Sequence, residues 1–318
     1  MTSSSLRQRS RLHIVVSGAG GLIGSALVRR LTIQGHRVSR LVRRAAGPGE
    51  IAWDPAARSL DPATLEGADA VVHLSGENVG ARWTTARKAR IRSSRVASTR
   101  LLSETLAGLQ RPPQVLISAS AVGIYGDRGD EVLTEESPPG DPNRDFLVSV
   151  TREWEKAAEP ARVEGIRVVH PRFGVVLSPA GGALRKMLLP FRLGLGARLG
   201  SGKQWMSWIS IDDAVQAVHQ ALVDDGLQGP VNVTAPEPLT NRDFTRTLAR
   251  VLSRPALFAV PESALRLALG EMAGGTILSS ARVVPARLLQ AGYHFGHPDL
   301  ESALRHVLQK DGRDNFPP

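Results

Sequence analysis

The chain has 318 residues, 42% hydrophobic and 22% charged, which is long enough for one large α/β unit or two domains. It contains no cysteine, which excludes disulfides, thiolate catalysis and cysteine-ligated metal, and its histidines show no metal-ligand spacing. Its net charge is +10, but the arginines are spread along the chain, so we expect a site for a polyanionic cofactor rather than a nucleic-acid partner.

The first eleven residues contain serine and arginine but no apolar core of a signal peptide. We expect residues 1–11 to form a flexible basic tail. No apolar run is long enough to span a bilayer, so we expect no membrane partner and a cytoplasmic location.

From residue 12 to 175, short β-branched runs alternate with amphipathic stretches. The runs are 13–17, 37–42, 50–53, 69–74, 114–118 and 167–171, and the amphipathic stretches are 22–34, 83–109 and 146–163. Such alternation is typical of parallel strands joined by right-handed helical crossovers. The sequence therefore predicts an α/β fold, a Rossmann-type doubly wound parallel sheet that binds ligands beyond the carboxyl ends of its strands.

The pattern changes after this domain. Residues 176–205 are rich in glycine, and 206–234 return to the sheet through a helix capped by Asp212 and a short strand, PVNV. Residues 235–318 are mostly helical. We expect 206–234 to complete the Rossmann domain, and 176–205 with 235–318 to form a smaller, mostly helical C-terminal lobe on the substrate side.

The strongest local motif is SGAGGLIG at 17–24, which follows a predicted strand and begins a predicted helix. Glycines at 18, 21 and 24 permit a tight turn, close approach of a pyrophosphate to backbone N–H groups, and close helix–strand packing. The strand before it and the helix after it favour a dinucleotide site over an ordinary glycine turn.

The second strand indicates which dinucleotide binds. NAD sites usually carry an acid there for the ribose 2′-hydroxyl, yet no acid occurs before Glu50. The strand ends instead in Arg43 and Arg44, whose guanidinium groups can pair with a 2′-phosphate. The alternative is two solvated arginines. The missing acid and the arginines together favour NADP(H).

Two further strand ends fit a cofactor. Asp54 closes the third run. It could contact the adenine there or form the turn before Pro55, and the sequence favours neither role over the other. HLSG at 73–76 closes the fourth and would bring the backbone of Leu74 and Ser75 against the cofactor ribose.

Several segments together resemble the extended and atypical short-chain dehydrogenases/reductases. They are the glycine motif, DAVVHLSG (69–76), SASAVGIYGD (118–127), PRFGVVLSP (171–179) and WISIDDAV (208–215). More narrowly, HLSGENV (73–79), the segment 187–209 and the block 269–304 resemble the nucleoside-diphosphate-sugar epimerase-like family that carries a C-terminal domain of unknown function.

This resemblance implies NADP(H) bound by the glycine loop and by Arg44, with a pocket completed by residues on later elements. The cofactor residues we expect are Gly18, Gly21, Leu22, Ile23, Gly24, Arg43, Arg44, Asp54, Leu74, Ser75, Arg95 and Val176. The chain departs from the family at Ser210, where a histidine is common.

The usual catalytic Tyr-x-x-x-Lys pair is missing. The only tyrosines are Tyr125 and Tyr293, and neither has a lysine four residues later. Phe146 is the best match to the tyrosine position. Ser120 remains as a candidate for holding a substrate oxygen, and Tyr125 is the candidate proton donor. The alternatives are a loop hydroxyl bonded to backbone and a packed aromatic.

Two functions follow. One is an NADP(H)-dependent oxidoreductase or epimerase acting on an unknown small molecule. The other is a non-catalytic NADP(H)-binding redox sensor, which the missing Tyr-Lys pair favours. The glycine loop supports both equally, and the sequence leaves catalysis, substrate and oligomeric state open.

Overall fold

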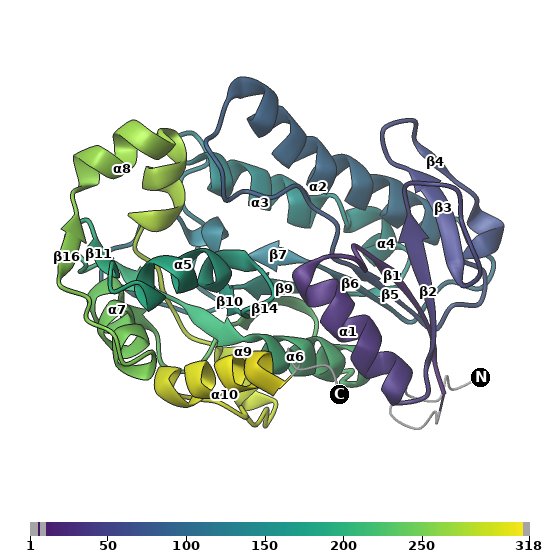
Figure 1. The fold of residues 1–318 in the computed structure, drawn as a ribbon. Helices are drawn as coiled ribbons and strands as arrows, with labels where there is room; N and C mark the ends of the chain where they lie inside the picture. The colour runs from purple at the N-terminus through teal and green to yellow at the C-terminus, as the bar shows by residue number, and fades with distance from the viewer. Residues whose placement is uncertain (1–5, 7–10, 314–318) are drawn as a thin grey trace.

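The computed structural model describes Leu6 and residues 11–313, and Figure 1 shows their course. The central sheet is built from β1 (His13–Ser17), β2 (Arg37–Val42), β3 (Glu50–Asp54), β4 (Ser59–Leu60), β5 (Ala70–His73), β6 (Val115–Ser118), β7 (Ser120–Ala121), β9 (Arg167–Phe173) and β14 (Gly229–Val233). Its order is β14-β9-β6-β5-β1-β2-β3-β4, and β7 pairs with β9. Every pair is parallel except β3 with β4. The predicted doubly wound sheet is confirmed.

Helices cover both faces of this sheet (Figure 1). The helices of the described chain, including those of the C-terminal part, are α1 (Leu22–Ile33), α2 (Thr85–Ala107), α3 (Phe146–Lys156), α4 (Glu159–Val163), α5 (Gly182–Arg192), α6 (Ile211–Val223), α7 (Asn241–Val251), α8 (Glu262–Leu269), α9 (Ala286–Gln290) and α10 (Leu300–Arg313). Leu27 of α1 and Val218 of α6 are buried with Ile117 on one face. Leu102 of α2 and Ala161 of α4 are buried with Leu116 on the other. Neighbouring strand residues thus point to opposite, equally buried faces.

The order in which strands are added reverses between β1 and β5. From β1 the chain continues to β2 and β3 on one side, then adds β5, β6, β9 and β14 on the other. Ser17 and His73, the last residues of β1 and β5, lie in register. Ligands of such sheets bind outside the carboxyl ends at this reversal, so the segments after Ser17 and His73 line the expected crevice.

The C-terminal part combines helices with short strand pairs. The pairs are β10 (Val175–Leu177) with β13 (Trp208–Ser210), β11 (Ala197–Leu199) with β16 (Phe258–Val260), β12 (Trp205–Met206) with β15 (Leu239–Thr240), and β8 (Val132–Leu133) with β17 (Arg282–Val283). Short turns are η2 (Pro62–Thr64), η3 (Val122–Tyr125) and the π-helical η4 (Ala273–Ile277). Trp208, Phe244 and Leu304 share a buried cluster between α7, α10 and β13. The helical character predicted for this part is confirmed, whereas its boundary at residue 175 stays a prediction.

Two local details differ from a simple interpretation of the sequence, and in one of them, the cap of α6, the prediction is wrong. The amphipathic stretch 146–163 forms two helices, since α3 ends at Lys156 and α4 begins at Glu159. Asp212 does not cap α6. The cap is Ser210, whose hydroxyl accepts a hydrogen bond from the backbone N–H of Asp213 at 3.0 Å.

The expected tail, residues 1–11, lies mostly outside the described residues. Leu6, which is described, is 1% exposed and belongs to the same buried cluster as Leu31. A residue of a free tail would be exposed instead. Among the described residues, no helix combines the length and apolar character needed to cross a membrane.

Asp213 fastens the C-terminal part to the Rossmann fold. Its buried carboxylate accepts hydrogen bonds from the backbone N–H groups of Gly296 at 2.7 Å and His297 at 3.1 Å. Its carbonyl oxygen accepts a third from the hydroxyl of Tyr293 at 2.8 Å. One residue of α6 thus satisfies the polar groups of a loop more than eighty positions away.

We expect Asp213→Ala to lower the free energy of unfolding by about 3 kcal/mol, because it leaves buried N–H groups unsatisfied. Its neighbour Asp212 is the matched control, since its carboxylate is 43% exposed and pairs with His306. Asp212→Ala should cost less than about 1 kcal/mol. Urea unfolding measures both, and equal losses would contradict the assignment.

Candidate functional site

Two glycines of the 18–24 loop are required by the fold itself. Gly18 has φ +68°, and a Cβ there would lie 2.6 Å from the carbonyl carbon of Leu74. A Cβ on Gly24 would overlap the carbonyl oxygen of Gly18. The loop after β1, the loop after β5 and the start of α1 therefore meet backbone to backbone.

Gly20 and Gly21 have a different reason for lacking a side chain. A Cβ on Gly20 would meet nothing within 4 Å, and one on Gly21 only the carbonyl oxygen of Gly18, at 3.2 Å. Gly21 is the N-cap of α1, brings no capping side chain, and the first turn of α1 contains no acid. The open backbone at a helix N-terminus fits a bound pyrophosphate.

Several of the predicted cofactor residues come together around this loop. Leu74 and Ser75 follow β5 and lie directly against Gly18. Leu22 lies against Gly181 and Gly182, to whose Cβ positions its side chain comes within 3.2 and 3.3 Å. The carbonyl oxygen of Val176 is 3.5 Å from that same Gly182 position. Ile23 is half-buried and packs on the core.

Arg95 of α2 lies beside the same loop. Its guanidinium carbon is 3.1 Å from the Cβ position of Gly76, and its Nη1 donates to the carbonyl oxygens of Glu77 at 3.0 Å and Ile91 at 3.3 Å. Burial lowers the pKa of Arg95 to about 10, an effect that the nearby Glu77 partly opposes. It remains a cation at neutral pH, held by carbonyl groups next to the expected crevice.

Arg43 and Arg44 lie at the carboxyl end of β2, one strand from the crevice, and both are exposed. Arg44 donates to both carboxylate oxygens of Glu50, at 2.7 and 2.8 Å. Arg40 lies 3.3 Å from the same carboxylate. Glu50 is thus already paired, and the side chains of Arg40, Arg43 and Arg44 place three positive charges at this edge.

Asp54 serves the turn after β3. Its carboxylate accepts hydrogen bonds from the backbone N–H groups of Ala56 at 2.9 Å and Ala57 at 3.2 Å. Of the two roles that the sequence left open, this geometry fits the turn.

Ser120 and Tyr125 belong to one buried polar network. The hydroxyl of Ser120 donates to Glu155 at 2.6 Å, and Glu155 accepts two further bonds from Arg172 at 2.8 and 2.9 Å. Arg172 also donates to the phenol oxygen of Tyr125 at 2.9 Å, and that phenol donates to Asn232 at 2.8 Å. Sequence reasoning missed Glu155, Arg172 and Asn232. Their signal was weak: Arg172 and Asn232 are single polar residues within largely apolar runs, and Glu155 is one of several charged residues in 152–156.

This network holds Tyr125 inside the protein. Its side chain is 0% exposed, and burial raises the pKa of its phenol, although Arg172 partly opposes the rise. Its proton is committed to Asn232. The hydroxyl of Ser120, 2% exposed, is likewise committed to Glu155. The geometry therefore does not support Tyr125 as a proton donor to substrate and fits the packed aromatic that the sequence left as the alternative.

Phe146, the best match to the missing tyrosine, lies in an apolar cluster. Its ring meets that of Trp83 edge-on, with centroids 5.1 Å apart. Met272 and Ile277 of the C-terminal part pack into the same cluster. Lys88 lies 4.7 Å from the centre of the Phe146 ring and pairs with Glu271 at 2.8 Å. The C-terminal part thus packs against the start of α3.

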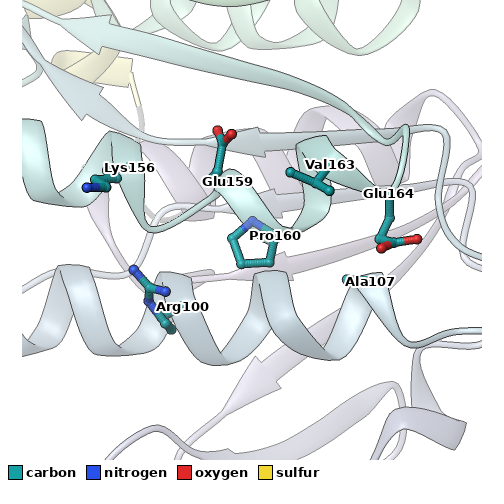
Figure 2. Close-up of a pocket in the computed structure, with 7 residues that line it drawn as sticks. All are labelled: Arg100, Ala107, Lys156, Glu159, Pro160, Val163 and Glu164. Carbon is teal, nitrogen blue, oxygen red and sulfur yellow. The ribbon is translucent and has the colours of Figure 1, made fainter.

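A surface pocket of about 350 Å³ lies between α2 and α4, and Figure 2 shows its lining residues. They include Arg100 and Lys156 together with the apolar Pro160 and Val163. None of the residues predicted for the cofactor or the substrate lines it, so it is separate from the crevice at the strand ends.

Comparison with known proteins agrees with this geometry. Residues 14–234 match the model of the NAD-dependent epimerase/dehydratase family, and residues 260–307 match a domain of unknown function. An epimerase family protein of Mycobacterium bovis is 44% identical over 301 residues, covering 94% of this chain and 98% of that protein. The human epimerase family protein SDR39U1 is 36% identical over 302 residues, covering 93% and 100%.

Solved structures are similar over the same length. The crystal structure of human SDR39U1 with NADPH has a TM-score of 0.85 at 34% identity, covering 94% of this chain and 99% of that one. A nucleoside-diphosphate sugar epimerase from Corynebacterium glutamicum has a TM-score of 0.78 at 38% identity, covering 97% of this chain and 63% of that one.

We expect Glu155→Gln to lower the free energy of unfolding at pH 7 by about 3 kcal/mol, because it leaves Arg172 buried without its counter-charge. Burial alone would raise the pKa of Glu155, but its bonds from Arg172 hold that pKa below the ordinary value. The carboxylate therefore stabilises the fold fully above pH about 4.3, and this stabilisation disappears as pH falls through its lowered folded pKa.

The difference between Glu155→Gln and the parent chain should accordingly shrink below about pH 4, as urea unfolding at several pH values measures. Glu159→Gln is the control, since Glu159 pairs with Arg162 on the exposed surface. It should change stability little. A pH-independent difference for Glu155→Gln would contradict the role of its charge.

Proposed function

Because the chain belongs to the NAD-dependent epimerase/dehydratase family, we propose that it binds NADP(H) across the carboxyl ends of β1 and β5. There it acts as an oxidoreductase or epimerase on a small substrate. The observation that carries this proposal is the open helix N-terminus at Gly20 and Gly21, beside two glycines that the fold itself requires.

In this proposal the predicted cofactor residues other than Asp54 line one groove. The backbone of Gly21, Leu22 and Ile23 binds the pyrophosphate, and Leu74 and Ser75 contact the cofactor along the loop after β5. Arg95 contributes positive charge, and Val176 limits the crevice on its far side. Bound NADP(H) supplies the hydride chemistry of the nicotinamide, while the chain supplies binding, orientation and exclusion of water.

The choice of NADP(H) over NAD rests on the carboxyl end of β2. Glu50 is already paired with Arg44, so it is a poor acceptor for the 2′-hydroxyl of NAD. A 2′-phosphate can share Arg44 with Glu50 and add Arg43. The human relative was crystallised with NADPH, which supports this choice.

A second candidate function is a non-catalytic sensor of NADP(H). The burial of Ser120 and Tyr125 and the apolar surroundings of Phe146 favour it. If the chain is an enzyme, as first proposed, Ser120 and Tyr125 are positioning residues. They hold α3 against β9 and do not touch the substrate.

We expect Arg44→Ala to weaken NADPH binding about tenfold to a hundredfold, the range for one charge-assisted contact, and to leave NADH binding unchanged. Quenching of the fluorescence of the five tryptophans measures both affinities.

Arg37→Ala, at the opposite end of β2, is the matched control and should change neither affinity. Gly21→Val should abolish binding of both nucleotides with an unchanged circular dichroism spectrum, since the backbone at Gly21 (φ −79°, ψ 174°) is extended and an added Cβ would meet only the carbonyl oxygen of Gly18, at 3.2 Å. Equal affinity for NADPH and NADH in the parent chain would overturn the choice of cofactor.

For the chemistry, we expect slow oxidation of NADPH in a screen of carbonyl compounds, quinones and sugar nucleotides. Ser120→Ala and Tyr125→Phe should each lower turnover and leave the NADPH dissociation constant nearly unchanged, because neither residue is assigned to the cofactor. Tyr293→Phe removes a comparably buried hydroxyl from the C-terminal part and should not alter turnover. If no compound class is turned over, the sensor becomes the better proposal.

A further inference from the structure

His73 has no part in the proposed site, yet it is buried directly beneath it. It is the last residue of β5, is 0% exposed, and immediately precedes Leu74. Its Nδ1 lies 2.6 Å from the hydroxyl of Ser17, the last residue of β1, and its Nε2 lies 3.1 Å from the hydroxyl of Ser98 on α2. The imidazole therefore joins two strands and a helix at the crevice.

The neighbouring bonds assign the protons. The hydroxyl of Ser98 donates to the carbonyl oxygen of Ser94 at 2.7 Å, so it accepts from His73 Nε2–H. Nδ1 is then the acceptor and receives the proton of Ser17. The hydroxyl oxygen of Ser17 in turn accepts from the backbone N–H of Leu74 at 3.2 Å, a hydrogen that it shares with the carbonyl oxygen of Ser17, also at 3.2 Å. Each hydroxyl donates its one hydrogen, and the imidazole is neutral with its proton on Nε2.

The surroundings keep the imidazole in that state. Burial lowers the pKa of His73 to about 4, so it is uncharged at neutral pH. The ring of Trp53 meets it edge-on at 5.9 Å. A neutral ring has one acceptor nitrogen, and here that nitrogen is directed to Ser17.

We propose that His73 is a positioning residue for the dinucleotide: through Ser17 it fixes the backbone of Leu74 over Gly18. This inference rests on the proposed binding of NADP(H). The loops after β1 and β5 fit tightly together, since the position of a Gly18 Cβ is only 2.6 Å from the Leu74 carbonyl. A small shift of Leu74 would therefore change the shape of the groove that the dinucleotide occupies.

Two substitutions of His73 test the contacts of its two ring nitrogens, Nδ1 and Nε2, separately. His73→Asn places an amide oxygen near the position of Nδ1 and keeps the acceptor for Ser17. His73→Gln places the side-chain amide of the longer glutamine near the position of Nε2. This amide keeps a donor for Ser98 but leaves the hydroxyl of Ser17 without its acceptor. We expect His73→Asn to keep NADPH affinity within about threefold and His73→Gln to lose about tenfold, the worth of one buried hydrogen bond.

Hydrogen exchange gives a readout that needs no cofactor. In the chain alone, the Leu74 amide should exchange faster in His73→Gln than in His73→Asn or the parent chain. Ser17→Ala serves as the second variant, should the glutamine variant fail to fold. It should reproduce both effects, and the double variant Ser17→Ala/His73→Gln should add little, because both changes remove the same link.

Equal NADPH affinities or equal Leu74 exchange rates in His73→Asn and His73→Gln, with similar melting temperatures, would overturn the inference. If the parent chain does not bind NADPH, the proposed function fails, and the exchange rates alone then decide whether His73 positions Leu74.

Discussion

The site depends on how closely three backbone segments approach one another at the reversal point of the sheet. Neither Gly18 nor Gly24 has room for a Cβ, because the loop after β5 and the loop's own carbonyl occupy that space. This contact sets where α1 begins and directs its N-terminus across the crevice. Gly20, by contrast, faces open space, and a Cβ on Gly21 would meet only the carbonyl oxygen of Gly18, at 3.2 Å. One short motif therefore contains two glycines that serve packing and two that leave room for a ligand.

A second constraint lies where related enzymes carry Tyr-x-x-x-Lys. There α3 carries Phe146 and Val150, and further along the same helix Glu155 pairs with Arg172 of β9 in a network that extends through Tyr125 to Asn232 of β14. The side chain of Asn232 donates to the carbonyl of Val284, and its backbone N–H donates to Glu135. A buried ion pair with further hydrogen bonds is weak evidence for net stability, but it holds its partners in one arrangement. The network thus ties sheet, helix and C-terminal part together.

The sequence predicts features that depend on neighbouring residues, such as strands and turns. It does not predict contacts between side chains that only folding brings together. The strands 13–17 and 37–42 and the glycine turn were identified correctly because β-branched runs and glycine spacing act over a few residues. Ser210 was missed as the cap of α6, because Asp212 and Asp213 next to it are equally good caps by type. The pairing of Arg44 with Glu50 and of Glu155 with Arg172 joins neighbouring elements, so no spacing rule reveals it. The roles of Ser120 and Tyr125 depended on such partners.

The two matched sequence regions are not independent in the structure. The second, residues 260–307, contributes Met272 and Ile277 to the apolar cluster that covers Trp83 and Phe146. Asp213 and Asn232, in the first region, hold its loops through backbone hydrogen bonds. In the function proposed above, the C-terminal part would build one wall of the substrate side, whereas the glycine loop and β2 would build the cofactor side. On that proposal, a change in the wall would alter the shape offered to a substrate without disturbing the dinucleotide groove, which is how one fold can keep its cofactor while its substrate changes.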